Sequence, residues 1–233
     1  MKKILVGAAA AFMALGSMAS AASFTLDTSG AIYTSIPGGL EGNQNTTAQN
    51  DVLNELQIGT LIGTHYTLFG YQGSQVMFSG GGKVRVELMG WEAGYENTFT
   101  LDGMTVGKVN GDPTTNIAPD VNTPLDEFVT GSLAAGLLDF EFSSENGNPP
   151  SDKGGVANGL NPILGQNFFA SFGPGNEDAT KGQVLWLFYD DGDVFGDNHD
   201  DLVIRISAVP LPAGMLLLLS GLGALAIRRK MTA

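Results

Sequence analysis

The sequence predicts an all-β protein, either an antiparallel β-sandwich or a jelly roll, flanked by one apolar segment at each end. Many short segments carry the alternation of apolar and polar residues that is typical of strands with one buried face. Clusters of Gly, Asn and Pro separate these segments and predict turns. Only one internal stretch, residues 51–57, has a pattern compatible with a helix.

The N-terminal residues 1–21 have the three-part layout of a secretory signal peptide. Two lysines precede an apolar run, and the small residues Ala19 and Ala21 follow it. We expect signal peptidase to cut after Ala21 or after the next residue, so that 22–208 forms the exported domain. The alternative is a membrane anchor, but the apolar run is shorter than the roughly 20 residues that a span needs.

Four internal segments give the clearest strand patterns. In 83–91 the apolar residues at 84, 86 and 88 alternate with charged residues at 83, 85 and 87, which predicts a half-buried strand. Segments 137–144 and 201–207 alternate in the same way, whereas 184–190 is apolar on both faces and is expected at the centre of a sheet. Shorter strands are expected at 24–26, 31–36, 65–71, 97–101, 104–109 and 166–172.

Two long surface loops are predicted, at 42–50 from its polar composition and at 144–159 from its many glycines. Glycine, asparagine and proline clusters predict further turns at 37–39, 80–82, 112–113 and 146–150.

The charge distribution excludes several partners. All 24 acidic residues lie between Asp27 and Asp201, and the expected exported domain has only six basic residues, which gives it a net charge of −18. Such a surface repels nucleic acid and anionic lipid, so we expect no nucleic-acid partner. The chain has no cysteine, so its stability must come from its core and any bound ions rather than from disulfides.

The C-terminal segment 209–233 combines a proline pair, an apolar run and a basic cluster. The run 213–227 is about 22 Å long as a helix, and counted from residue 209 it approaches the ~30 Å of bilayer hydrocarbon. The positive-inside rule places the basic cluster in the cytoplasm: Arg228, Arg229 and Lys230. Physical argument alone leaves open a plain anchor or a sorting signal whose extended proline strip a processing enzyme grips.

This order of features resembles the PEP-CTERM class of bacterial C-terminal sorting signals, in its VPLPA variant. The motif residues are Val209, Pro210, Leu211, Pro212 and Ala213. The resemblance implies that a membrane-embedded exosortase recognises the motif and processes the protein in a Gram-negative-type bacterium. Leu211 stands where the name-giving class has glutamate, which implies the variant's own sorting enzyme. The resemblance covers the last 25 residues and implies nothing about the body.

The densest chemical signal is YDDGDVFGDNHDD, residues 189–201, where six aspartates lie between two predicted strands. Carboxylates that converge to ~4 Å repel by about 1 kcal/mol in water and about 4 kcal/mol near a protein surface, which favours a bound cation. Oxygen ligands favour calcium. The candidate ligands are Asp191, Asp193, Asp197 and Asp200. The alternative is a solvated polar turn. An EF-hand is excluded, because apolar residues occupy two of its ligand positions.

Two further strips, 90–99 (GWEAGYENTF) and 197–212 (DNHDDLVIRISAVPLP), resemble segments of exported proteins with the same type of tail. The resemblance implies a β-rich body and no catalytic assignment. Within 90–99 the aromatic residues predict packing beside a turn. The alternative is that Trp91 and Tyr95 form a platform for a sugar ring.

Catalytic templates find little support in this sequence. The lack of cysteine excludes a thiol nucleophile, the two histidines do not form a zinc helix motif, and the glycines at 80–82 lack the spacing of a phosphate loop. We therefore expect a non-enzymatic protein of the cell surface or extracellular matrix, associated with exopolysaccharide or biofilm. The alternatives are a calcium-dependent carbohydrate-binding module and a polysaccharide hydrolase, since 24 acidic residues always allow a carboxylate pair.

Overall fold

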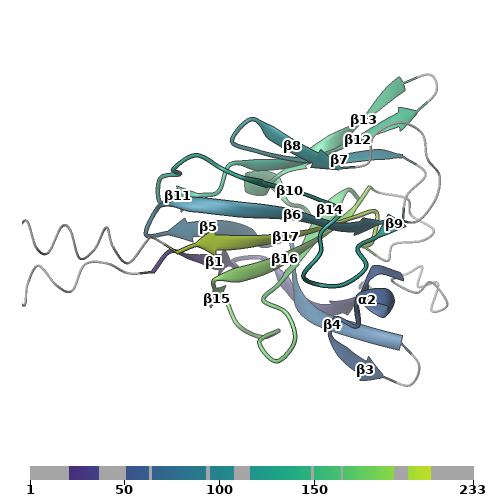
Figure 1. Cartoon of the computed structure of the whole chain (residues 1–233), viewed down its shortest axis with the longest axis horizontal. Coiled ribbons are helices and arrows are strands. Elements are labelled where there is room, and N and C mark those ends of the chain that lie inside the picture. The colour runs from purple at the N-terminus through teal and green to yellow at the C-terminus, as the bar shows by residue number, and fades with distance from the viewer. Residues whose placement is uncertain are drawn as a thin grey trace, which may run out of the picture.

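The computed structural model describes residues 21–36, 51–62, 65–92, 95–107, 116–147, 150–163, 165–191 and 199–210. Over these residues the protein consists mainly of antiparallel strands, which confirms the all-β prediction (Figure 1). The predicted segments outside the described residues include most of the signal peptide, the loop at 42–50, the turns at 37–39 and 112–113, and the apolar run and basic cluster of the tail. Within the described ranges, no helix has the length and apolar character needed to cross a membrane.

The largest sheet has nine strands. Its main path, in spatial order, is β10 (Asp126–Val129), β6 (Lys83–Trp91), β17 (Leu202–Val209), β16 (Val184–Asp190), β14 (Asn167–Ser171), β4 (His65–Gln72) and β2 (Ile32–Ile36). Two short strands complete it: β3 (Thr60–Ile62) beside β4 and β9 (Asn116–Ile117) beside β6. Strand β16 lies centrally and is buried except for its first residue, as its doubly apolar sequence predicts.

Two smaller sheets have four strands each. One contains β11 (Gly136–Leu137), β5 (Gln75–Ser79), β1 (Ser23–Asp27) and β15 (Lys181–Gly182). The other contains β13 (Pro150–Ala157), β12 (Phe140–Gly147), β7 (Glu96–Leu101) and β8 (Met104–Gly107), and a 3₁₀ turn at Asn158–Leu160 follows β13. The sequence analysis did not identify β5, whose five residues alternate between half-buried and buried positions.

One hydrophobic core joins all three sheets. It contains Phe24 of β1, Phe78 of β5, Phe142 of β12, Leu187 of β16 and Ile204 of β17, each with 1% or less of its surface exposed. Burying a side chain of this size contributes about 1.5–3 kcal/mol. The sheets of this cysteine-free chain are therefore held together by apolar packing.

The helix predicted at 51–57 is confirmed as α2 (Asp51–Leu56). It covers one end of the other face of the nine-stranded sheet (Figure 1), where Val52 and Leu53 share a second core with Phe188 and Val203. The helix ends because Gln57 adopts a left-handed backbone conformation with φ of 54°, a common way to terminate a helix.

This second core corrects the prediction that 83–91 is half-buried. Glu87 has only 7% of its surface exposed, and the three residues that follow it are also buried. The reason is tertiary: α2 and residues 116–125 cover the face of β6 that the alternation assigns to solvent, and Ala118 and Met89 belong to the same core.

The long surface loop predicted at 144–159 is also wrong. Residues 140–147 and 150–157 form the antiparallel pair β12–β13, with a register shift between Ser144 and Glu145. Glycine is needed here rather than tolerated, because a Cβ atom on Gly155 would lie 2.4 Å from the carbonyl oxygen of Phe142. The glycines of this segment led to the prediction of a loop. In the structure they allow the edge strand β13 to approach β12 closely.

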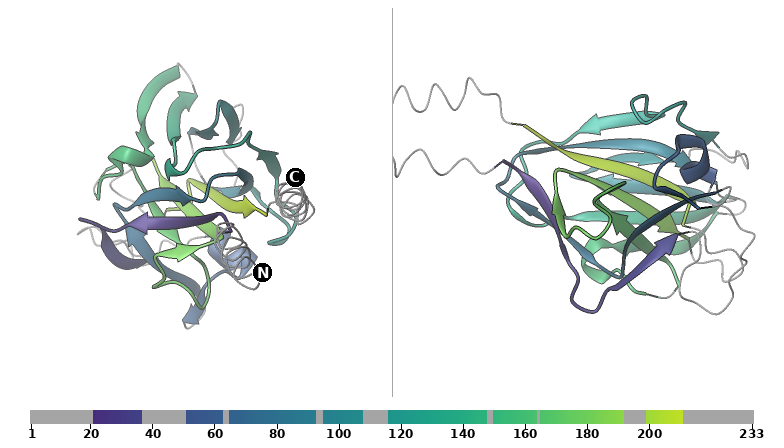
Figure 2. Two further views of the ribbon diagram at one scale, coloured as in Figure 1. Left: turned by 90° about the vertical axis from the view of Figure 1, so that its left-hand side faces the viewer. Right: turned by 90° about the horizontal axis from the view of Figure 1, so that it is seen from below.

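The first and last strands of the body have their outer ends at one end of the molecule (Figure 2). Ser23 pairs with Ser79, and Val209 pairs with Lys83, while only the tight turn 80–82 separates those two partners. Strand β17 runs from there to Leu202, about 23 Å away at ~3.3 Å per residue. We call the end that holds Ser23 and Val209 the proximal end, and the opposite one the distal end.

Candidate functional site

Three aspartates meet at the distal end. Strand β16 ends at Asp190 and β17 begins at Leu202, and the pairing of these antiparallel strands brings the flanking residues together. Asp190, Asp191 and Asp201 each place one carboxylate oxygen so that the three oxygens lie within 4.8 Å of one another. The backbone N–H of Asp191 also donates to Oδ2 of Asp201 over 2.8 Å. We call these three residues the acidic cluster.

The acidic cluster is largely shielded from water. Asp190 and Asp191 are each 3% exposed, and Asp201 is half-buried. Withdrawing an ionised carboxylate from water costs several kcal/mol, and like charges at this separation add repulsion. The arrangement therefore favours binding of a cation.

A fourth side chain enters the cluster from another sheet. Asn97 of β7 is fully buried, and its Nδ2 donates to Oδ2 of Asp191 and to the backbone oxygen of Asp201, both over 3.3 Å. Its Oδ1 is buried and has no hydrogen-bond partner within the described part of the chain. Asn97 therefore links the β7 sheet to the ends of β16 and β17 and presents an amide whose oxygen is unsatisfied.

Two buried hydroxyl oxygens, of Ser144 and Tyr189, belong to neighbours of Asn97 and Asp190. Ser144 is directly opposite Asn97 across the β12–β7 ladder, and Tyr189 precedes the cluster on β16. Neither hydroxyl has a hydrogen-bond partner among the described residues, although both residues are fully buried. Burial first, and then the carboxylates of Asp191 and Asp201, raise the pKa of Tyr189 well above its ordinary value. The hydroxyl therefore stays protonated beside the cluster.

The predicted ligand set is only partly brought together. Asp191 belongs to the acidic cluster, and Asp193 and Asp197 lie outside the described residues. Asp200 is fully buried, but its carboxylate is not part of the cluster, and its backbone oxygen accepts from the N–H of Glu92 over 2.8 Å. The sequence analysis missed Asp190, Asp201 and Asn97 as ligand candidates. Their positions at strand ends were the available signal for the two aspartates.

The described parts of strips 90–99 and 197–212 pack against each other. Strand β6 pairs with β17, so that Gly90 lies opposite Val203, and Asn97 reaches Asp201. Trp91 packs partly against the main core, which agrees with aromatic packing rather than an exposed sugar platform. The described residues of these two strips, 90–92, 95–99 and 199–210, thus contribute to one structural unit around the acidic cluster.

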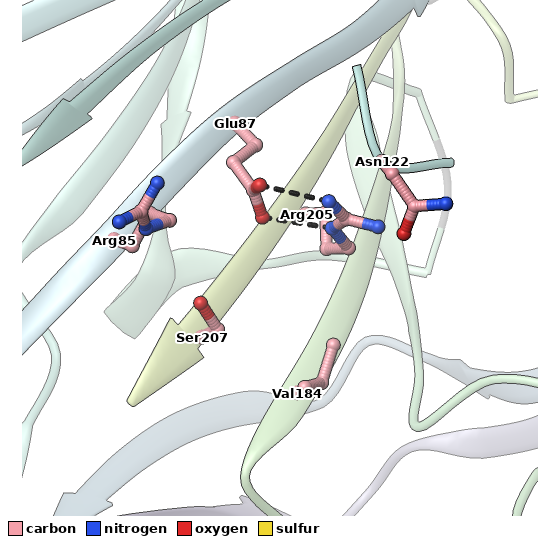
Figure 3. Close-up of a pocket in the computed structure, with 6 residues that line it drawn as sticks. All are labelled: Arg85, Glu87, Asn122, Val184, Arg205 and Ser207. Carbon is pink, nitrogen blue, oxygen red and sulfur yellow. Dashed lines mark hydrogen bonds and ion pairs between the residues drawn. The ribbon is translucent and has the colours of Figure 1, made fainter. Parts of the chain in front are cut away.

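A second charged group lies on the same sheet, nearer the proximal end. Glu87 accepts two hydrogen bonds from Arg205, at 2.8 Å each, and Nη1 of Arg205 also donates to the backbone oxygen of Val121. The guanidinium carbon of Arg205 lies 5.4 Å from the ring centroid of Trp186. This pair borders a shallow depression of about 360 Å³ (Figure 3). The other lining residues are Arg85, Asn122, Val184 and Ser207.

The glycine turn that the sequence analysis separated from phosphate loops is structural. Residues 80–82 connect β5 to β6, and all three glycines have positive φ. Gly82 forms a bridge with Leu133 through two backbone hydrogen bonds. The turn therefore fixes strands at the proximal end.

The chain matches no protein-family model, no curated protein and no solved structure.

Proposed function

We propose that this chain is an exported, non-enzymatic protein of a Gram-negative-type bacterium that is sorted to the cell surface or extracellular matrix. The observation that carries the proposal is the position of the two body ends. Ser23 follows the expected signal-peptidase site, Val209 begins the expected sorting motif, and their strand partners are separated by one tight turn. Both processing enzymes, signal peptidase and an exosortase-type enzyme, would therefore act at the proximal end.

The body would extend away from the membrane before the tail is processed. Strand β17 continues to Val209 without an intervening linker, and Pro210 directly after it is exposed. The proximal end would then face the membrane, held by a helix at 213–227 and a basic cluster at 228–230, and the distal end with its acidic cluster would face outward. We infer a β-sandwich, since one core is shared by the nine-stranded sheet and both smaller sheets.

Association with extracellular polysaccharide is part of this proposal, and a calcium-dependent carbohydrate-binding module is its alternative. The burial of Asp190 and Asp191 argues against direct coordination of sugar hydroxyls by an ion held there. The same burial argues against Asp190 and Asp191 as the carboxylate pair of a hydrolase, because such a pair must face the sugar ring. The described acidic cluster therefore favours a structural role over either alternative.

The sorting proposal is tested with the double variant Pro210→Ala/Pro212→Ala in a host that has the matching sorting enzyme. This variant keeps the apolar run and eases helix formation, since proline is about 3 kcal/mol worse than alanine inside a helix. We expect the parent to lose its tail and reach the surface or matrix, and the variant to remain unprocessed in the inner membrane. Fractionation with intact-mass measurement reports both outcomes.

The matched control is Pro174→Ala, which changes an exposed proline in the body. It should be processed like the parent. If parent and double variant both stay in the inner membrane with Ala233 attached, the tail is a plain anchor and the sorting proposal is wrong.

A further inference from the structure

We propose that the acidic cluster and Asn97 bind one calcium ion, which fastens the β7 sheet to the paired ends of β16 and β17. This inference goes beyond sorting and does not depend on it. It rests on four side chains from two sheets: Asn97 of β7, and Asp190, Asp191 and Asp201 at the strand ends.

The ligand chemistry favours calcium. Carboxylate and amide oxygens are hard ligands, and calcium accepts six to eight of them in irregular geometry, whereas magnesium requires a nearly ideal octahedron. Zinc prefers cysteine and histidine. The chain has no cysteine, and Nε2 of His199 lies 2.9 Å from Oδ1 of Asn167 in a hydrogen bond.

Asn97 is the observation that distinguishes this site from an ordinary group of acidic residues. Its fully buried amide is directed at Asp191 and Asp201, yet Oδ1 has no hydrogen-bond partner among the described residues. A half-turn of the amide exchanges its nitrogen and oxygen with little change of shape. With the ion bound, we therefore expect Oδ1 to replace Nδ2 on the side of the cluster.

The buried hydroxyls support the same interpretation. Buried polar groups are nearly always satisfied in folded proteins, and each exception needs an explanation. Asn97 Oδ1, Ser144 Oγ and Tyr189 Oη are three such exceptions. Asn97 contacts the acidic cluster, Ser144 lies opposite Asn97 in the ladder, and Tyr189 directly precedes Asp190. A cation with its water ligands would supply partners for oxygen atoms that otherwise have none among the described residues.

The ion would act as a fastener between sheets at the distal end. Calcium sites of extracellular modules bind at about 10⁻⁴–10⁻³ M, so a site in this range fills outside the cell. At 100 times Kd, binding stabilises the folded state by about 2.7 kcal/mol, which corresponds to a rise of roughly 5–10 °C in Tm for a domain of this size.

The test uses the full chain, purified in mild detergent and stripped with a chelator. We expect calcium chloride to raise Tm by the stated 5–10 °C at saturation, and calorimetry to give one calcium per chain. Magnesium chloride at the same concentration should give less than a quarter of the shift. An unchanged Tm with no heat of binding, or an equal shift with magnesium, would overturn the proposal.

Two charge-neutralising variants locate the site. Asp191→Asn and Asp201→Asn should each weaken calcium binding at least tenfold, while both remain folded in the chelator because each loses a repelling charge. The matched control is Asp139→Asn, which changes an exposed aspartate before β12 and should bind calcium like the parent. Equal binding by all three variants would place calcium elsewhere and reject the assignment.

Asn97→Asp separates a ligand from a simple hydrogen-bond donor. If Asn97 is a ligand, the added carboxylate should lower Tm in the chelator and enlarge the calcium-induced rise beyond that of the parent. If Asn97 only donates a hydrogen bond, the variant should be less stable in both conditions with no larger rise. The second outcome would contradict the proposed role of Asn97.

Discussion

The acidic cluster and the Glu87–Arg205 pair are two buried charged groups on neighbouring parts of one sheet, and they are balanced differently. The side chains of Arg205 and Glu87 are only 15% and 9% exposed, and the guanidinium of Arg205 neutralises the carboxylate through two hydrogen bonds. At the distal end, the carboxylates of Asp190, Asp191 and Asp201 converge instead with the neutral amide of Asn97. The described part of the first group joins opposite charges, whereas the described part of the second brings like charges together.

This difference shows which part of the fold should have a stability that does not depend on ions in the solvent. A bidentate pair between arginine and carboxylate has fixed geometry and brings its own counter-charge. A group of like charges changes in stability with each cation or proton that it binds. We therefore expect the middle of the sheet to be insensitive to calcium and the distal end to respond to it.

The largest effect is expected from breaking the balanced pair. Arg205→Met should lower the free energy of unfolding by about 3–5 kcal/mol, because it leaves the buried carboxylate of Glu87 without its partner. Urea unfolding measures this loss, and it should be the same with calcium and with chelator. The double variant Glu87→Leu/Arg205→Met should recover much of the loss. A single variant as stable as the parent would show that the pair is not buried in solution.

An effect of opposite sign is expected at the distal end. In chelator at pH 8, Asp201→Asn should raise the free energy of unfolding by about 1–2 kcal/mol, less than the ~4 kcal/mol for one bare pair of charges at 4 Å near a surface. The remaining donors, such as Asn97 Nδ2, already moderate the repulsion. Urea unfolding in chelator checks the sign. A loss of stability there would mean that the carboxylates are balanced within the chain, as Glu87 is.

The smallest effect is expected from the exposed pair Arg85–Glu127. Its atoms Nη1 and Oε2 are 2.7 Å apart, but the two side chains are 43% and 47% exposed. Exposed pairs of this kind contribute about 0–1 kcal/mol and are screened by salt. Arg85→Gln should therefore change the urea midpoint only slightly, at low and at high salt. A loss as large as that of Arg205→Met would show that exposure does not separate the two pairs.

Much of the fold follows from local pattern. Leu202, Ile204 and Ile206 alternate along β17 and face the main core, because side chains on a strand point to opposite faces in turn. The doubly apolar segment 184–190 became the central strand β16, and 51–57 gave the one helix that the sequence predicts within the body. Each of these features depends on residues that are close in sequence.

The candidate site was only partly predictable, because its residues are not all close in sequence. The segment 189–201 identified the acidic region, but of its four candidate ligands only Asp191 belongs to the described cluster. The described cluster is built instead from Asp190 and Asp201, which are paired through strands, and from Asn97, about a hundred residues away in the chain. Alternation along β7 places Asn97 on the same buried face as Phe99 and Leu101, but no local pattern indicates that its amide meets Asp191 and Asp201.

The sequence by itself determined where most strands of the body begin and end and where several turns lie, because side-chain alternation and backbone preference are local properties. Only the tertiary structure decided that Glu87 is buried against Arg205, that 150–157 is an edge strand rather than a loop, and that Asn97 meets the acidic cluster. Each of these outcomes depends on which strands become neighbours. Strand pairing depends on the free energy of packing the whole core, and a short segment of sequence does not determine that free energy.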